Sequence, residues 1–178
     1  MRMMKWVHQM GFCMVLLSAV SDAGAVSNDA GTSWLRIPAS TRSAAMGEAL
    51  GAVADPVDGV VLNPAGLGLL DESNLAISQN FWAQDSSIQH FSFTRGSSEG
   101  VGLALGGEYV NFGEIPFYRV KGSSIVSNGN RSPFGLNLYG GAGKKLWKDL
   151  RGGVTAHFLY DNIYEGAEGK SWAVDVGF

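Results

Sequence analysis

Apolar side chains alternate with small or polar ones in six separate segments of the chain after residue 73. The segments are residues 74–82, 88–95, 101–109, 134–143, 154–160 and 171–178. In the third segment, for example, Leu103 and Leu105 alternate with Ala104 and Gly106. A period of two places successive side chains on opposite faces of a strand. The pattern therefore predicts six strands, each with one apolar face and one face of small or polar residues.

The residue types on the non-apolar face favour one all-β architecture over another. The outer face of a soluble sandwich usually carries charged residues and threonine, whereas Gly, Ala, Ser and Asn dominate here and suit the inside of a narrow or plugged barrel. Aromatic residues also lie near strand ends, as in interfacial girdles: Trp82, Tyr109, Phe134, Tyr160 and Trp172. We therefore expect an all-β fold, an antiparallel transmembrane β-barrel that is partial, with about six strands or more. A soluble sandwich with ordinary core aromatics is the alternative.

The first 25 residues have the features of a secretory signal peptide. Arg2 and Lys5 give a positive start, residues 10–20 are apolar, and residues 23–25 supply a small-residue cleavage site. The apolar run is shorter than the ~20 residues that a spanning helix needs. Cleavage after residue 25 would also remove Cys13, the only cysteine, so we expect an exported chain without a disulfide.

Residues 26–73 are expected to form a short helical hatch or plug, followed by the barrel strands in residues 74–178. Residues 40–50 are the only plausible helix, with Ser40 or Thr41 as its cap and Gly51 at its end. Residues 52–70 contain many turn signals and are too apolar for a solvated loop.

The connections between the predicted strands indicate an orientation in the membrane. Residues 95–100 and 145–151 are short connections, whereas residues 111–133 form a long one. Short turns of outer-membrane barrels face the periplasm and long loops face outward, so both termini would be periplasmic. The last predicted strand ends on Phe178, an aromatic ending that outer-membrane assembly machinery reads in such barrels.

The charge and the polar residues argue against an enzyme and against a nucleic-acid-binding protein. The formal net charge is −3, which is no electrostatic footprint for nucleic acid. His90 and His157 are isolated on polar strand faces, where a lumen-facing role is expected rather than that of a base or a metal ligand. Asp55 and Asp58 lack the ligand ladder of a calcium loop. We expect no catalytic residue, no metal and no cofactor.

Residues 31–70 resemble the N-terminal signature of PorV/PorQ-type proteins, a branch of the FadL-like outer-membrane barrels. The matching positions, in order, are Arg42, Met46, Gly47, Val53, Ala54, Asp55, Asn63, Pro64, Ala65 and Gly66. Residues 135–161 resemble a strand, Lys-Lys-Leu, turn and Gly-rich strand hairpin of the same family. The chain departs from the family at Val61-Leu62, where aromatic residues are common, and in length, since family barrels are usually about twice as long.

The resemblance implies uptake of long-chain fatty acids or other small hydrophobic molecules across the outer membrane. The ligand site at the hatch would then include Asn63, Pro64 and Ala65, although a purely structural turn is an equal alternative for these residues. The implied partners are outer-membrane lipid, the hydrophobic ligand and the assembly machinery. PorV-type members imply a different role, an adaptor that docks secreted proteins, in which residues 111–133 would matter more than the lumen.

Six strands are too few to close, because single-chain outer-membrane barrels start at about 8 strands. Unpaired edges in hydrocarbon would leave backbone groups without hydrogen bonds. The chain is therefore expected to be a truncated N-terminal half-barrel, which could be non-functional. Otherwise it closes as a homo-oligomer, or with a further pair of strands from residues 117–126.

Overall fold

The computed structural model describes residues 33–38, 40–47, 59–82, 85–164 and 167–178. The chain divides into two units, Met1–Ala30 and Gly31–Phe178, and all described residues belong to the second. The predicted signal peptide lies outside the described residues. So do residues 48–51, where the predicted helix was expected to end.

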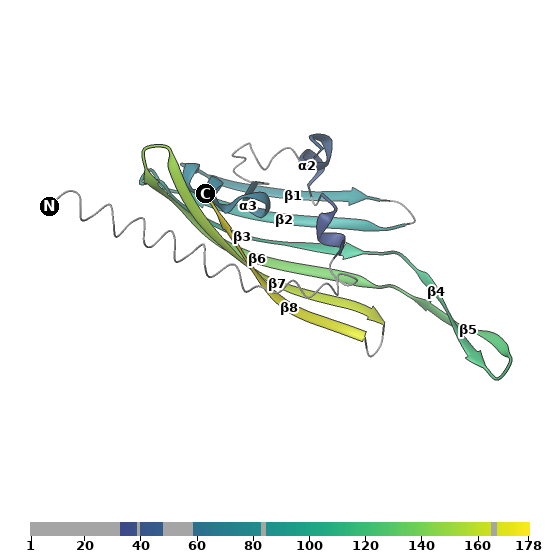
Figure 1. The fold of residues 1–178 in the computed structure, drawn as a ribbon. Helices are drawn as coiled ribbons and strands as arrows, with labels where there is room; N and C mark the ends of the chain where they lie inside the picture. Colours follow the sequence, from purple (N-terminus) through teal and green to yellow (C-terminus); the bar gives the residue numbers. More distant parts are fainter. Residues whose placement is uncertain (1–32, 39, 48–58, 83–84, 165–166) are drawn as a thin grey trace. The chain divides into compact units, whose positions relative to one another are not determined.

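The main element is an antiparallel sheet of six strands in the order β1-β2-β3-β6-β7-β8 (Figure 1). The strands are β1 (Ser73–Phe81), β2 (Ser87–Gly96), β3 (Val101–Asn111), β6 (Phe134–Trp147), β7 (Leu150–Tyr164) and β8 (Ala167–Gly177). Each predicted strand coincides with one of them, so the antiparallel all-β prediction is confirmed at this level. Every strand pairs with its neighbour along the meander.

The long connection between β3 and β6 is a hairpin, which corrects the prediction of a loop there and agrees with the alternative of a pair of strands in residues 117–126. It consists of β4 (Ile115–Lys121) and β5 (Ser124–Arg131), which pair with each other as a separate two-stranded sheet. Figure 1 shows these strands continuing past the ends of β3 and β6. The partners of Pro116 and Tyr118 are Asn130 and Ser127, so β5 carries one extra residue opposite Phe117, and this bulge interrupts the alternation along β5. The hairpin is not part of the main sheet, so it does not supply the two extra strands considered for closure.

The main sheet is open, with β1 and β8 at its two edges. Within the described residues neither edge strand pairs with a further strand, and no closed barrel forms. The physical reason is size, because a ring of six strands encloses too little space to hold a segment of chain against its inner face. The partial barrel of the sequence prediction is therefore reduced to an open antiparallel sheet.

The two faces of the sheet differ in the way that the alternation predicts. One face, here the outer face, carries exposed apolar side chains: Leu75, Ile77, Phe81, Phe91, Phe93, Leu103, Leu105, Leu138, Val154, Trp172, Val174 and Val176. The opposite, inner face carries buried and mostly polar side chains: His90, Ser92, Thr94, Glu108, Asn137, Tyr139, Thr155, His157 and Asp161. This distribution is the reverse of a water-soluble sheet, in which the apolar face is buried.

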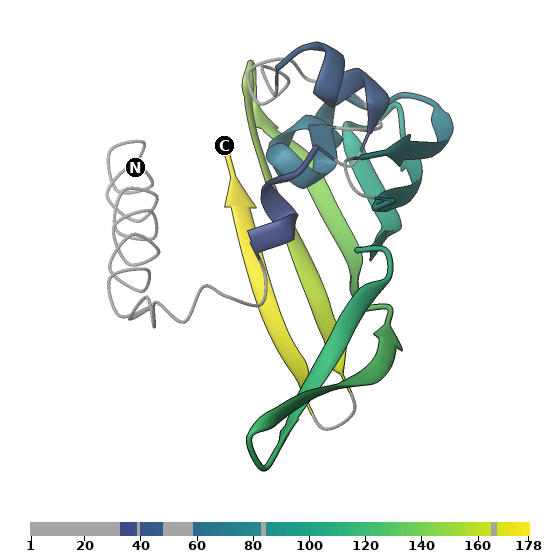
Figure 2. The ribbon, with the colours of Figure 1, turned by 90° about the vertical axis from the view of Figure 1, so that its right-hand side faces the viewer.

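The inner face is covered by an N-terminal segment of short helices, residues 33–70 as far as they are described. These are η2 (Ser33–Arg36), α2 (Thr41–Ala45), α3 (Gly59–Leu62) and η4 (Pro64–Leu69). Figure 2 shows them gathered on the inner side of the sheet. Ser40 caps α2, as the sequence predicts, by accepting a hydrogen bond from the amide of Ser43 at 3.0 Å. No helix of the described residues is long and apolar enough to cross a membrane.

Candidate functional site

A row of five glycines crosses five neighbouring strands on the inner face, near the short turns. The strand register places Gly96 opposite Gly102, Gly102 opposite Gly143, Gly143 opposite Gly153, and Gly153 opposite Gly177. Without side chains, these positions form a shallow strip of bare backbone on which another backbone can lie closely. We call this strip the glycine row.

Residues 63–70 of the N-terminal segment lie directly on the glycine row. Asn63 and Pro64 meet Gly177, Pro64 meets Gly153 and Gly143, Leu67 meets Gly143 and Gly102, and Leu70 meets Gly96. A Cβ atom at Gly143 would lie 2.7 Å from the Cβ of Leu67 and 2.8 Å from the carbonyl oxygen of Pro64. Such distances are too short for a side chain, so the row fixes where this segment packs.

The Asn-Pro-Ala turn begins the part of the segment that packs on the row. Asn63 caps η4 by accepting a hydrogen bond from the amide of Ala65 at 3.0 Å, and Pro64 occupies the first turn, where it needs no donor. Pro64 and Ala65 are buried against the sheet. Leu67 and Leu70 join Val60, Ala104 and Tyr139 in one of the two apolar clusters of the described residues.

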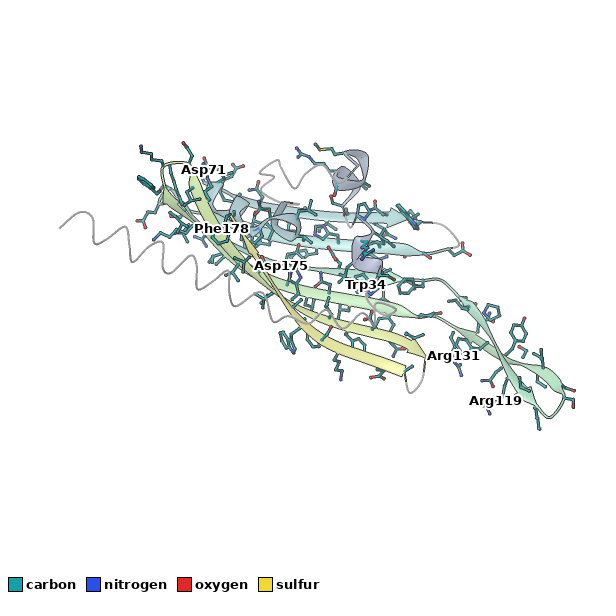
Figure 3. The ribbon with its side chains drawn as sticks, viewed as in Figure 1. Trp34, Asp71, Arg119, Arg131, Asp175 and Phe178 are labelled. Carbon is teal, nitrogen blue, oxygen red and sulfur yellow. The ribbon has the colours of Figure 1, made fainter. Side chains whose placement is uncertain are left out.

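At the opposite end of the strands, Trp34 anchors η2 to the sheet (Figure 3). Its Nε1 donates a hydrogen bond to Oδ1 of Asp161 at 2.6 Å, and both residues are buried. Its ring lies over Gly135, where a Cβ atom would be 2.5 Å from the indole, and it packs with Ile88 and Val110. The N-terminal segment is thus fixed at both ends of the inner face.

A hydrogen-bonded row of polar side chains crosses the inner face between these two anchors. Asn137 on β6 donates from Nδ2 to Oε2 of Glu108 on β3 at 3.1 Å, and its Oδ1 lies 3.1 Å from Nδ1 of His157 on β7. His157 Nε2 is within ion-pair distance, 3.1 Å, of Oδ2 of Asp175 on β8. Buried polar groups destabilise a fold unless they are paired. In this row, side chains from four strands give one another the polar contacts that water gives to exposed groups.

A second polar contact depends on another inner-face glycine. The hydroxyl of Tyr139 lies 3.0 Å from Nε2 of His90, and its ring reaches that histidine across β3. A Cβ atom at Gly106 would collide with the Tyr139 ring, so this position must be glycine for the ring to lie flat.

A cavity of about 80 Å³ lies between the N-terminal segment and the inner face. It is lined by Leu35, Arg36, Ile37, Pro38, Ser40, Ser43, Val61, Leu62, His90 and Glu108. Apolar side chains come mainly from the N-terminal segment, and the sheet contributes polar side chains. This combination suits a small amphiphilic molecule, because an apolar pocket with a few polar groups binds and orients such ligands.

The candidate ligand residues of the sequence analysis lie beside this cavity rather than in its lining. Asn63, Pro64 and Ala65 are engaged in the capped turn on the glycine row, and none of them lines the cavity. The structure therefore provides a structural role for all three, and their role as ligand residues stays a prediction. His90 and His157 lie on the inner face, as their positions in the alternating pattern predict.

The partners of the two histidines were missed by sequence reasoning, which treated them as isolated. Tyr139 interrupts the small-residue face of its segment, and Glu108 is a lone acid in a Gly-rich strand. These two irregularities were the only features of the sequence that could have indicated partners for the histidines. The strand register that brings the side chains together is not encoded by any local motif.

Comparisons of the chain with models of protein families, with curated proteins and with solved structures found no match. The resemblance to FadL-like barrels therefore stays a prediction, and the site is interpreted from its own geometry.

Replacing Gly143 by alanine tests the packing on the glycine row. We expect Gly143→Ala to lower the free energy of unfolding by about 1–3 kcal/mol, the usual cost of overpacking, and to expose residues 63–70 to protease. Gly140→Ala on the same strand is the control, since its Cβ would have no neighbour closer than 3.8 Å. Denaturant unfolding measures the free energy of unfolding of both variants, and limited proteolysis measures the exposure of residues 63–70. Equal effects of the two variants would contradict the close packing described here.

The Trp34–Asp161 hydrogen bond can be tested separately. Trp34→Phe removes the donor but keeps an aromatic ring, and leaves the buried Asp161 carboxylate without this partner. We expect a loss of about 1–3 kcal/mol in the free energy of unfolding. Asp161→Asn retains an acceptor oxygen and is expected to cost less. If Trp34→Phe were as stable as the parent protein, the hydrogen bond would not anchor η2.

Proposed function

We propose that this protein is an outer-membrane β-strand protein that takes up small hydrophobic molecules. The observation that carries the membrane location is the reversed distribution of side chains on the sheet. Leu75, Ile77 and Phe81 of β1 are 62%, 76% and 82% exposed, and the apolar character continues across every strand to Trp172 on β8. A continuous apolar surface of this extent is costly in water and favourable in hydrocarbon.

The polar inner face supports the same proposal. Strands that span a membrane alternate between an apolar side toward lipid and a polar side toward the lumen. Here the polar side is filled by the N-terminal segment, as expected for a hatch or plug. The aromatic rings of Tyr109, Phe134 and Tyr160 adjoin one another at one end of the strands, with centroids 5.5 and 5.8 Å apart. Such a row is typical of the aromatic residues that lie at the membrane–water interface.

The two free edges of the sheet bear on how the protein would exist in a membrane. Edge backbone groups that pair with no further strand among the described residues would be unfavourable in hydrocarbon, where each missing hydrogen bond costs several kcal/mol. Further strands must pair with both edges. They could come from a second copy of the chain, and an antiparallel match is available because β1 and β8 run in opposite directions in a sheet with an even number of strands.

The cavity between the N-terminal segment and the sheet is the proposed ligand site. Its apolar lining from Leu35, Ile37 and Val61 would contact a hydrocarbon chain. A carboxylate head would meet the guanidinium of Arg36 and the carboxyl of Glu108, whose pKa is raised by burial. Together with the sequence resemblance, this favours a fatty acid or a similar amphiphile, of which a cavity of about 80 Å³ holds only one end. Its small volume means that passage requires the N-terminal segment to move.

Leu105→Arg tests the membrane location. Leu105 lies in the middle of β3 on the outer face and is 61% exposed. In lipid, arginine near the bilayer midplane costs about 2–4 kcal/mol, whereas at an exposed position of a soluble protein it changes stability by about 0.5 kcal/mol or less. We expect Leu105→Arg to abolish folding into vesicles, measured as loss of the heat-modifiable, protease-resistant band on cold SDS-PAGE. Leu105→Ala is the control and is expected to fold. Normal folding of Leu105→Arg would contradict the proposal.

Val61→Phe tests the ligand site in protein that has folded into vesicles. Val61 lines the cavity, so a larger side chain should occupy ligand space and weaken binding of a fluorescent long-chain fatty acid about tenfold. Val126→Phe on the exposed hairpin is the matched control, with no effect expected. Variants are compared only after both show the heat-modifiable band. Unchanged binding by Val61→Phe would exclude this cavity as the site.

A further inference from the structure

The β4–β5 hairpin has one apolar face and one basic face. The register pairs Tyr118 with Ser127 and Val120 with Ile125, which places these side chains on one face. Arg119 pairs with Val126 and Lys121 with Ser124, on the opposite face. Tyr118, Val120 and Ile125 are 64%, 72% and 74% exposed. The apolar face is thus open to its surroundings.

The hairpin also differs in charge from the rest of the chain. Residues 115–131 contain Arg119, Lys121 and Arg131 but no acidic residue, although the whole chain has a net charge of −3. In Figure 3, Arg119 and Arg131 lie on the hairpin, at the opposite end of the strands from Asp71 and Phe178. Positive charge is therefore concentrated beyond one end of the main sheet.

The hairpin continues from the end of the sheet that carries the aromatic row. Tyr109 is near the end of β3 and Phe134 begins β6, the two strands that the hairpin connects. Beside this row, Nζ of Lys170 lies 5.6 Å from the ring centroid of Tyr160. Aromatic rings and lysine mark the level of lipid headgroups in membrane proteins, so the hairpin begins where the headgroup region is expected.

An isolated two-stranded hairpin is marginally stable in water, and this one exposes large apolar side chains as well. A membrane surface would satisfy both faces, because it offers apolar chains below the headgroups and negative charge at their level. We propose that the β4–β5 hairpin lies along the membrane surface, with Tyr118, Val120 and Ile125 toward the acyl chains and its cations on the phosphates of anionic lipids. This inference rests on the proposed membrane location of the main sheet.

In the structure the hairpin continues past the ends of β3 and β6 (Figure 1), so lying flat on the surface requires a bend at its base, and the length of the hairpin is the reason to expect that bend. Its seven-residue strand β4 extends roughly 20 Å at about 3.3 Å per residue, much more than the thickness of one headgroup layer. An upright hairpin would hold Val120 and Ile125 in water. A hairpin along the surface brings all three apolar side chains to the acyl boundary and leaves Arg119 and Lys121 at the phosphates.

The test places an environment-sensitive fluorophore on each face of the hairpin in the full chain. Ile125→Cys reports on the apolar face and Ser124→Cys on the basic face, both with Cys13→Ser to leave a single thiol. The labelled protein is folded with vesicles of phosphatidylcholine alone, or of phosphatidylcholine and phosphatidylglycerol in equal parts. We expect a blue shift and quenching by lipid-attached quenchers at position 125 in the anionic vesicles, and a smaller response at position 124.

The role of the cations is tested by a charge variant with a matched control. Arg119→Gln with Lys121→Gln removes two cations, each worth about 1 kcal/mol at an anionic surface, so the ratio of docked to free hairpin should fall about 25-fold. Lys144→Gln with Lys148→Gln removes two exposed cations near the β6–β7 turn and should leave the signal at position 125 unchanged.

The outcomes separate this inference from the proposed function. Protease protection of the main sheet with a water-exposed position 125 in both vesicle types would overturn the hairpin inference alone. An unprotected main sheet would contradict the proposed function and would remove the membrane location on which this inference rests, whatever the response at position 125. Equal effects of the two charge variants would overturn the inference. So would a response to a soluble polyglutamate peptide without one to anionic vesicles, which would indicate an acidic protein partner.

Discussion

The structure depends on the close approach of one backbone to another along the glycine row. Residues 63–70 cross five strands in the space that side chains at Gly96, Gly102, Gly143, Gly153 and Gly177 would fill. Because the register aligns these glycines, the segment has one place to lie. Its leucines then form an apolar cluster with Ala104 and Tyr139 on a face that carries many polar side chains. The packed interior of this protein is thus on the small-residue side of the sheet.

This arrangement determines the character of both faces. The inner face pairs some of its buried polar side chains with one another, through the Glu108–Asn137–His157 row and the Trp34–Asp161 hydrogen bond. The apolar side chains are left on the outer face, where none of the described elements covers them. A sheet built in this way needs an apolar environment on one side and strands at both edges, and a membrane with additional strands would meet both requirements.

The sequence predicts the strands well because the alternation is a local signal with a direct geometric cause. All six segments and the separation of their faces agree with the structure, and so does the Ser40 cap. The hairpin was considered only as an alternative, a pair of strands from residues 117–126 for closure, because the extra residue in β5 interrupts its alternation. The glycine row and the polar row could not be predicted, because both depend on the register between strands, which the alternation within a single strand does not determine. The open sheet, in contrast, agrees with the expectation from the number of strands, since six are too few to close.

The most direct test of the central claim compares neighbouring positions on one strand. Ala173 and Val174 of β8 face opposite sides of the sheet, since Ala173 pairs with the inner-face His157. A spin label at each position, in protein folded into vesicles, reports contact with oxygen, which concentrates in lipid, or with a water-soluble nickel complex. The account predicts oxygen contact at position 174 and nickel contact at position 173. Nickel contact at both positions, or the reverse pattern, would contradict a lipid-facing outer surface.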